Sequence, residues 1–226
     1  MIALEPPTIA ALNERWHSAT PAEIIHEALG QFPDIAMTSG FNLNGVVLID
    51  MAVRAGYRGK LIFIDTGYHF AETLNLHADL EARYPELEFI TLNANQPDDK
   101  LFERDTDLCC HRRKVEPLRE YLAELQPSAL LSARNQAGAT TRAGLEPLQT
   151  GERFKVNPLF NTSMEELESY VETHKLKLNP LYAQGYLSIG CAPCTRAVKP
   201  GEDVRAGRWA GQAKTECGLW WGKDAL

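Results

Sequence analysis

The chain of 226 residues has 23 Lys and Arg against 30 Asp and Glu, which gives a formal net charge of −7, and 44% of its residues are hydrophobic. This composition is close to that of globular domains, so it excludes a disordered chain and predicts one soluble domain with an appendage. No run of 18 apolar residues occurs, and the first 16 residues lack the pattern of a secretory signal, so we expect a cytoplasmic protein with no membrane span. The negative charge argues against nucleic acid as a partner, because binding to phosphates needs a basic face.

Strands and helices alternate through the first 135 residues. Thr20 to Glu23 has the pattern of a capping box with Pro21 at the first helical position, which predicts a helix that ends at Gly30. Apolar runs predict strands at 35–38, 61–64, 87–92 and 129–133, and helical patterns separate them at 43–55, 69–83 and 115–125. This alternation predicts an α/β fold with a mainly parallel, twisted sheet and helices on both faces.

Polar loops follow three of the predicted strands. In parallel sheets the ligand lies at the carboxyl ends of the strands, so we expect these loops to meet at one edge. They are Ser39-Gly40, Asp65-Thr66-Gly67 and Arg134-Asn135-Gln136.

The alternation of strands and helices fades after residue 150. A second capping box at Ser163 to Glu166 predicts a helix to about His174, and Gly, Pro and polar residues dominate from Asn179 onward. We therefore expect a sheet domain over residues 1–150 and a C-terminal extension over residues 151–226.

The cysteines are the most informative residue type. Their number is odd, which argues against a disulfide framework in a cytoplasmic chain. Four of them form an adjacent pair and a distant C-x-x-C, and thiolates suit zinc or an iron–sulfur cluster. Adjacent cysteines point apart in a strand, so a shared centre requires a turn or a helix start. The spacing alone leaves open a cluster, structural zinc, and buried or redox-paired thiols. The pairs are Cys109 with Cys110 and Cys191 with Cys194.

The fifth cysteine, Cys217, lies in a polar segment near the end of the sequence. A free cysteine is often a packed, small hydrophobic residue. Here Lys214, Arg205 and Arg208 are near in sequence, and such cations lower a thiol pKa and favour the nucleophilic thiolate. Cys217 is therefore a candidate nucleophile.

Two groups of residues are candidates for binding an anion. Ser39 and Gly40 lie between a strand and a helix, where backbone N–H groups and the helix dipole favour phosphate; an ordinary turn is the alternative. Arg134, Gln136 and Arg142 lie on a later loop, and Arg binds phosphate or sulfate in a bidentate manner. The alternative there is a solvated surface.

Eight segments carry a family resemblance in their order along the chain. They are SGFNLNG at 39–45, IDTG at 64–67, CCHRRK at 109–114, RNQ at 134–136, NPL at 157–159, GYLSIGCAPCTRAV at 185–198, GRW at 207–209 and ECGLW at 216–220. Together they resemble the thioredoxin-dependent adenylyl-sulfate and phosphoadenylyl-sulfate reductases of sulfate assimilation. The resemblance implies an adenine-nucleotide alpha-hydrolase-like fold, a nucleotide-binding domain over 1–150 and an extension that completes a cluster site and carries the catalytic tail.

The resemblance also implies residue roles. Cys217 would be the nucleophile that attacks the sulfate sulfur of adenosine 5′-phosphosulfate (APS), expelling AMP and leaving a thiosulfonate. Thioredoxin or glutaredoxin would then attack Cys217 and release sulfite. The branch with both cysteine pairs binds a [4Fe-4S] cluster through Cys109, Cys110, Cys191 and Cys194 and typically prefers APS. Its 3′-phosphorylated form (PAPS) is the alternative substrate, and homo-oligomers are common in the family. The implied substrate-binding residues are Ser39, Gly40, Asp65, Thr66, Lys114, Arg134, Gln136, Arg142, Arg205 and Arg208.

The sequence departs from the family pattern at two places. Trp220 stands where the tail usually has His, and Ala133, Asn135 and Ala137 replace an Arg, an acid and a Ser around Arg134. The first change removes a His that would contribute to thiol activation or thioredoxin docking. The changes around Arg134 affect substrate affinity or the choice between APS and PAPS.

Two rival interpretations fit less of the sequence. ATP pyrophosphatases that thiolate tRNA share the fold, but their S-G-G-x-D-S loop has an acid that residues 39–44 lack. A zinc-stabilised binding module explains four cysteines but gives no role to Cys217 or to the nucleotide loops.

Overall fold

The computed structural model describes residues 5–93 and 96–219, and within these ranges the sheet has the strand order β3-β2-β1-β4-β6-β5. Every neighbouring pair is parallel except the last, in which β5 runs antiparallel to β6. The prediction of a mainly parallel sheet is therefore confirmed. The strands are β1 (Ile35–Thr38), β2 (Lys60–Asp65), β3 (Glu88–Asn93), β4 (Ala129–Ser132), β5 (Leu148–Gln149) and β6 (Phe154–Val156).

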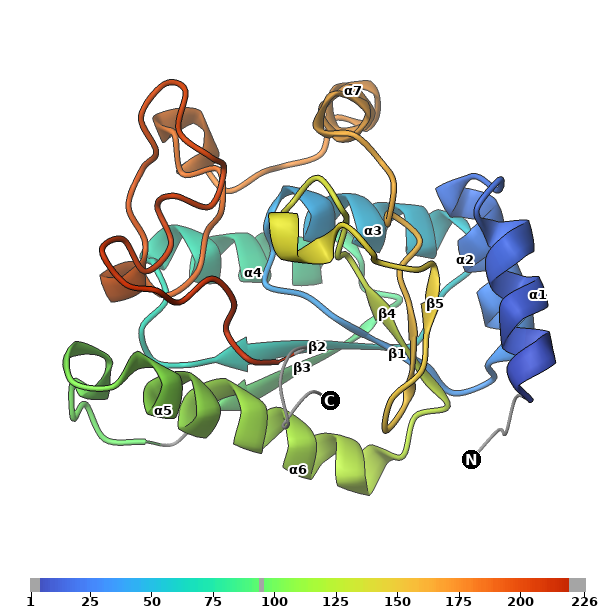
Figure 1. Ribbon diagram of the computed structural model, residues 1–226, viewed down its shortest axis with the longest axis horizontal. Coiled ribbons are helices and arrows are strands. Elements are labelled where there is room, and N and C mark those ends of the chain that lie inside the picture. Colours follow the sequence, from blue (N-terminus) through green and yellow to red (C-terminus); the bar gives the residue numbers. More distant parts are fainter. Residues whose placement is uncertain (1–4, 94–95, 220–226) are drawn as a thin grey trace.

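Helices cover both faces of the sheet, as the alternation predicts (Figure 1). On one side lie α3 (Leu43–Arg54) and α4 (Ala71–Arg83), and on the other lie α5 (Thr106–Cys110) and α6 (Glu116–Leu125). Alternate residues of one strand serve the two layers, since Met37 of β1 joins the larger core cluster and Ala36 joins the cluster with Leu118 and Leu122 of α6. The other helices are α1 (Pro6–Trp16), α2 (Pro21–Gln31) and α7 (Met164–His174).

Capping side chains start the helices that the sequence marks most clearly. Thr20 and Ser163 both accept a hydrogen bond from the backbone N–H three residues on, and both capping boxes are complete. The predicted end of α2 at Gly30 is wrong by one residue. The helix continues to Gln31 and ends because Phe32 adopts an extended conformation before Pro33, while its ring is fully buried.

The sheet continues beyond the expected boundary at residue 150. That boundary falls between β5 and β6, and β6 pairs in parallel with β4. These strands have two and three residues, too few to give an alternating pattern in sequence. The first helix, α1, is also absent from the sequence predictions.

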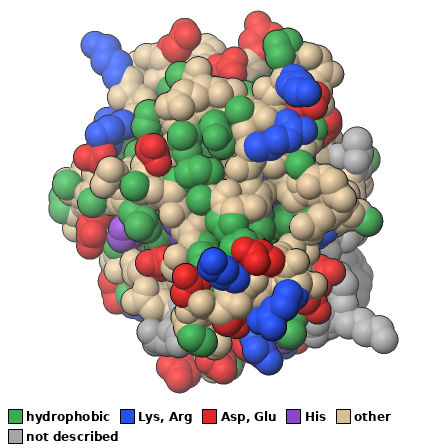
Figure 2. All heavy atoms as spheres, turned by 90° about the vertical axis from the view of Figure 1, so that its left-hand side faces the viewer, with side chains coloured by type: hydrophobic (Ala, Val, Ile, Leu, Met, Phe, Trp, Pro, Cys, Tyr) green, Lys and Arg blue, Asp and Glu red, His purple; other side chains and the backbone are tan. Residues whose placement is uncertain are grey.

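Residues 175–219 wrap over the carboxyl edge of the sheet as loops with short 3₁₀ turns (orange to red in Figure 1). Isolated bridges pair His69 with Cys191 and Thr195 with Arg208, which fixes the segment to the β2–α4 loop and to itself. The face that these loops form carries a central group of hydrophobic side chains with basic and acidic side chains around it (Figure 2). No helix in the described ranges is long and apolar enough to cross a membrane.

Candidate active site

Cys109, Cys110, Cys191 and Cys194 line one small pocket, although the two pairs lie 80 residues apart in sequence. Three of the four cysteines are buried, Cys194 is half-buried, and all four are free thiols. The fold therefore brings together the four cysteines that the sequence singles out.

The adjacent pair is carried by a helix with an irregular turn. Cys109 and Cys110 end α5, a π-helical segment follows over His111–Val115 (η2), and α6 begins at Glu116. Pro117 explains the wide turn, because its ring clashes with the carbonyl group four residues earlier and it donates no hydrogen bond. Adjacent residues on a helix are about 100° apart, so both thiols can face one pocket, as they cannot in a strand.

The second pair lies on a loop that is tied to the sheet edge. The backbone N–H of Ala192 donates to the carbonyl oxygen of Tyr68 at 2.7 Å, and that of Cys194 donates to the carbonyl of Cys191 at 3.0 Å. Thr66 Oγ1 lies 3.2 Å from Cys191 Sγ. The end of β2 therefore positions the C-x-x-C directly.

Two cationic side chains also line the cysteine pocket. Arg113 is buried, donates from Nη1 to the carbonyl oxygen of Thr66 at 3.0 Å and lies with its Cζ 4.4 Å from the centre of the Tyr68 ring. Lys114 lines this pocket and also the larger cavity beside it. Trp209 is likewise shared by both linings, so these two side chains separate the cysteine pocket from the cavity.

Burial and these cations shift the thiol pKa values in opposite directions. Burial raises the pKa of Cys110 to about 11 and also raises the pKa of Cys109 and of Cys194. Burial opposes ionisation of Cys191 as well, but Lys114 and the hydrogen bond to Thr66 outweigh it, so the pKa of that thiol is lowered. Burial would lower the pKa of Lys114, yet the thiols of Cys191, Cys110 and Cys217 raise it above its ordinary value. Lys114 therefore stays charged.

The larger cavity, of about 210 Å³, lies at the carboxyl ends of β1, β2 and β4. Thr38, Ser39 and Gly40 supply one wall, and Asn42 caps α3 by accepting a hydrogen bond from the N–H of Gly45 at 2.9 Å. A phosphate group is favoured here by the amino terminus of α3. This is the edge at which the polar loops were expected to meet.

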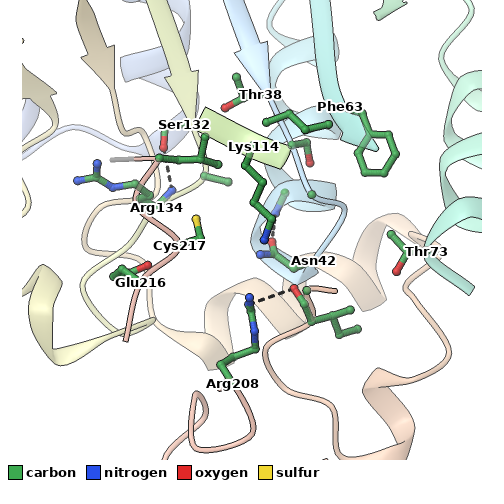
Figure 3. Close-up of a pocket in the computed structure, with 18 of the residues that line it drawn as sticks. Thr38, Asn42, Phe63, Thr73, Lys114, Ser132, Arg134, Arg208, Glu216 and Cys217 are labelled. Atoms are coloured by element: carbon green, nitrogen blue, oxygen red, sulfur yellow. Dashed lines mark hydrogen bonds between the residues drawn. The ribbon is translucent and has the colours of Figure 1, made fainter. Parts of the chain in front are cut away.

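Five basic side chains line the same cavity, and Cys217 lies among them. Figure 3 shows Lys114 and Cys217 reaching into the cavity from different elements, with Arg208 below them. The Arg208 guanidinium lies 4.4 Å from the Trp209 ring centre and donates to the carbonyl oxygen of Ile189 at 3.4 Å. Burial is the main cause that lowers the pKa of Arg134 to about 10, and the nearby positive charge of Arg142 lowers it further. The five cations are Lys114, Arg134, Arg142, Arg205 and Arg208.

Glu216 is the one acidic side chain in the lining of this cavity within the described part of the chain. It accepts hydrogen bonds from Arg142 at 3.0 Å (Nε) and 3.1 Å (Nη2), and from Arg205 Nη2 at 3.2 Å. The residue that precedes Cys217 therefore fixes the tail to two of the five cations.

The structure separates the expected substrate-binding residues into two groups. Among the described residues, Asp65, Thr66 and Gln136 do not line the cavity. Asp65 Oδ1 accepts from the N–H of Gly67 at 2.9 Å, Thr66 lines the cysteine pocket, and Gln136 Nε2 donates to the carbonyl oxygen of Leu145 at 3.1 Å. The other seven line the cavity, namely Ser39, Gly40, Lys114, Arg134, Arg142, Arg205 and Arg208.

Sequence reasoning did not identify several residues of the two sites. Glu216 and Trp209 fall within the matched segments ECGLW and GRW, so the sequence marks both positions. It does not reveal that Glu216 pairs with arginines or that the Trp209 ring stacks on Arg208. Arg113 lies beside Lys114 and was given no role. Trp220, the departure from the family pattern, lies outside the described residues.

Comparisons with known proteins identify the family of the chain. The family model described as "Phosphoadenosine phosphosulfate reductase domain" matches residues 34–197. The "Adenosine 5'-phosphosulfate reductase" of Deinococcus radiodurans is 57% identical over 213 residues, which cover 91% of this chain and 84% of that protein. The "Phosphoadenosine phosphosulfate reductase" of Saccharomyces cerevisiae is 36% identical and covers 88% of this chain and 84% of its own length.

A solved structure has the same fold. The phosphoadenylyl-sulfate (PAPS) reductase from Candida auris, in its phosphate complex, aligns with a TM-score of 0.78 and 29% identity and covers 86% of this chain and 99% of that chain. The family match over residues 34–197 and the relative at 57% identity show that the chain belongs to the phosphoadenosine phosphosulfate reductase family.

Proposed function

We propose that the protein reduces adenosine 5′-phosphosulfate to sulfite and AMP as a thioredoxin-dependent reductase of sulfate assimilation. The observation that carries the proposal is the position of Cys217, which lies in a cavity with Lys114 and four arginines. Such a cavity suits a substrate with a phosphate and a sulfate group, and the cysteine is the nucleophile that the reaction needs.

In the first half-reaction the Cys217 thiolate attacks the sulfur atom of the sulfate group. A new S–S bond forms, the bond between that sulfur and the bridging oxygen breaks, and AMP leaves with the electron pair. Negative charge builds up on AMP, and Lys114 and Arg208 line the cavity in which it is stabilised. The product on the enzyme is a thiosulfonate, S-sulfocysteine.

In the second half-reaction a dithiol protein, thioredoxin or glutaredoxin, reacts with that thiosulfonate. One of its thiolates attacks Cys217 Sγ, the S–S bond to the sulfonate breaks, and sulfite leaves. Its second thiolate then resolves the mixed disulfide and restores the Cys217 thiolate. The dithiol is oxidised to a disulfide, and its two electrons are those that reduce the sulfate sulfur.

We also propose that Cys109, Cys110, Cys191 and Cys194 hold a [4Fe-4S] cluster. Four thiols lining one pocket beside two cations fit a group bound by thiolates. In the described ranges no group of three or more His, Cys, Asp or Glu side chains is arranged to hold a metal ion. In a cluster each thiolate binds its own iron, so the four side chains need not converge on one point as the ligands of a single zinc ion do. When bound, the cluster supplies local charge beside Lys114, and the electrons still come from the dithiol.

The choice between APS and PAPS is the finer part of the proposal. The presence of both cysteine pairs favours APS, and the relative from Deinococcus radiodurans is named for this substrate. The yeast relative is named for the 3′-phosphorylated substrate. Sulfite is therefore measured from each nucleotide separately with reduced thioredoxin. Sulfite from neither would refute the activity, and a strong preference for PAPS would refute the substrate.

The sharpest test of the mechanism is Cys217→Ser. The variant is expected to bind AMP with unchanged affinity, to retain its iron and to release no sulfite, because only the nucleophile is lost. With the unaltered enzyme and APS, but no dithiol, mass spectrometry should find one sulfonate on Cys217. A sulfonate on another cysteine, or sulfite release by the variant, would contradict the mechanism.

A further inference from the structure

The carboxylate of Glu216 lies between the guanidinium groups of Arg142 and Arg205. All three side chains are shielded from solvent, with exposed fractions of 12% for Glu216, 13% for Arg142 and 16% for Arg205. The Arg142 contact is bidentate, through Nε and Nη2 to the two carboxylate oxygens. Removing one partner of a shielded ion pair of this geometry lowers stability strongly, because the other charge is left without a partner. Removing one partner of an exposed ion pair has a much smaller effect.

This ion triad joins three separate segments. Arg142 ends the 3₁₀ turn η3 (Thr140–Arg142) after β4, Arg205 lies in the C-terminal loops, and Glu216 lies in the tail. Arg205 also donates from Nη2 to the carbonyl oxygen of Thr215 at 2.7 Å, so it holds the tail backbone as well as the carboxylate. The peptide bond that follows Glu216 leads directly to the nucleophile.

The other polar contacts of the tail have an exposed partner. Lys214, itself 9% exposed, pairs with Asp107, whose side chain is 82% exposed, and Gln212 accepts a hydrogen bond from the hydroxyl of Thr106 at 2.8 Å near the surface. Water competes for an exposed partner, so such contacts contribute less than fully shielded ones. The triad is therefore the contact next to Cys217 in which every charged partner is shielded.

We propose that Glu216 is a positioning residue, a charge latch that holds Cys217 in the cavity for attack on sulfur and releases it for reaction with the dithiol partner. This rests on the proposed function, whose two half-reactions make opposite demands on the tail. The thiolate must be held among the cations in the first and must become accessible to a second protein in the next. An ionic latch meets both demands, since it forms and breaks without covalent change.

Access to Cys217 tests the latch without requiring activity. Iodoacetamide is applied to the iron-loaded protein, and alkylation of Cys217 is followed by mass spectrometry of its peptide. We expect Glu216→Gln to be alkylated at least about fivefold faster than the unaltered protein, because an amide cannot pair with two guanidinium groups. Added salt should speed alkylation of the unaltered protein and have a smaller effect on the variant.

A matched control is Glu202→Gln. Glu202 pairs with Arg196 in the same C-terminal loops, also through two hydrogen bonds, of 2.8 Å and 3.2 Å, but neither residue lines the cavity. Its alkylation rate at Cys217 should match that of the unaltered protein. Equal rates for Glu216→Gln and the control would overturn the proposal.

The two half-reactions, measured separately, distinguish a latch from a merely structural residue. Glu216→Gln should form the Cys217 thiosulfonate at least about fivefold more slowly, and Glu216→Asp should recover part of the rate. Cleavage of a preformed thiosulfonate by the dithiol should be unchanged or faster. Tighter binding of APS with faster thiosulfonate formation would instead show that Glu216 competes with substrate, and would overturn the latch. Absence of thiosulfonate in the unaltered protein would refute the proposed function itself, while the alkylation result would still stand.

Discussion

Arg208 shows how a single glycine shapes the cavity. Its guanidinium lies over the Trp209 ring, which stacks against one side of the planar group. Gly190 lies on another side, where a Cβ atom would come within 2.3 Å of Arg208 Nη2 and 2.5 Å of its Cζ. Only glycine therefore leaves room for the guanidinium at its present position.

Gly190→Ala is therefore expected to displace Arg208 while leaving the fold intact, because the clash is with the end of a flexible side chain. Loss of one charge-assisted contact to the substrate corresponds to about 1.5–3 kcal/mol, so KM for APS should rise by about ten- to a hundredfold. Steady-state kinetics measures the change, and iron content shows whether the neighbouring Cys191 is disturbed.

Gly144→Ala is the matched control, since a Cβ there meets nothing within 4 Å. Its KM should equal that of the unaltered protein. An unchanged KM in Gly190→Ala would show that the position of Arg208 does not matter for binding.

Among single residues, a functional role can be predicted from the sequence where the residue type is rare and has a distinctive chemistry. Five cysteines and a short list of basic residues limit the choices, and the four paired cysteines do line one pocket. Glu216 could not be assigned a role because its partner Arg142 is 74 residues away and because an acidic side chain is not expected in an anion-binding site. The loop of Gln136 lies at the predicted edge of the sheet, but the hydrogen bond of its side chain to the carbonyl oxygen of Leu145 could not be read from the sequence.

Helices α3, α4 and α7 are tied together by one buried carboxylate. Asp50 of α3 is 3% exposed and accepts hydrogen bonds from Tyr84 Oη at the end of α4 (2.9 Å), from Tyr170 Oη of α7 (2.8 Å) and from Arg54 Nε (2.6 Å). Burial opposes ionisation of Asp50, but the hydrogen bonds from Arg54, Tyr170 and Tyr84 outweigh it, and the pKa of the carboxyl is lowered. Burial and, next, the hydrogen bond to Asp50 raise the pKa of Tyr84 to about 12.

Asp50→Asn should therefore lower the free energy of unfolding by about 2–3 kcal/mol near neutral pH, since an amide cannot satisfy three donors. The sign of the pH dependence follows from the lowered pKa. The carboxylate stabilises the fold above its unfolded-state pKa of about 3.9, and this contribution is lost as the pH falls through the lower folded-state value. The difference between the two proteins in urea unfolding should thus shrink as the pH falls below about 4.

Asp79→Asn serves as the control for that comparison. Asp79 pairs with Lys177 at the surface, where the two side chains are 43% and 61% exposed, so its loss should change the free energy of unfolding by less than about 1 kcal/mol. A pH-independent difference between Asp50→Asn and the unaltered protein would contradict the ionised state of Asp50.

Elements with a strong local signal were predictable, and elements that depend on tertiary pairing were not. Both capping boxes and the strands β1, β2, β3 and β4 occur where the sequence places them within a few residues. Strand β6 forms because its three residues pair with β4, which no local pattern reveals. The π-helical turn has a local cause in Pro117. That Cys109 and Cys110 share a pocket with Cys191 and Cys194, however, depends on a loop that is distant in sequence.

The described part of the molecule consists of a sheet core, which is held by apolar packing, and a layer of C-terminal loops, which has little apolar packing. The larger core cluster takes residues from α1 to α4 and from α7, whereas from the C-terminal loops beyond residue 182 it takes none among the described residues. Those loops are held instead by the cysteine pocket, by the bridge between His69 and Cys191, and by ion pairs such as Glu216 with Arg142. The proposed cluster would therefore contribute order mainly to this layer.

Removal of iron should consequently loosen one part of the molecule and spare the other. Without a cluster, the buried thiols of α5 and of the 191–194 loop lose the group that joins them, so amide hydrogen exchange should accelerate at residues 106–115 and 187–212. Exchange in β1 and β4 should stay as slow as before, because their side chains pack in the sheet core. Cys194→Ser should reproduce the iron-free pattern, whereas Cys217→Ser should retain iron and the native pattern. Acceleration throughout the sheet would instead mean that the cluster stabilises the whole fold, and no acceleration in the loops would mean that the four thiols do not share a metal centre.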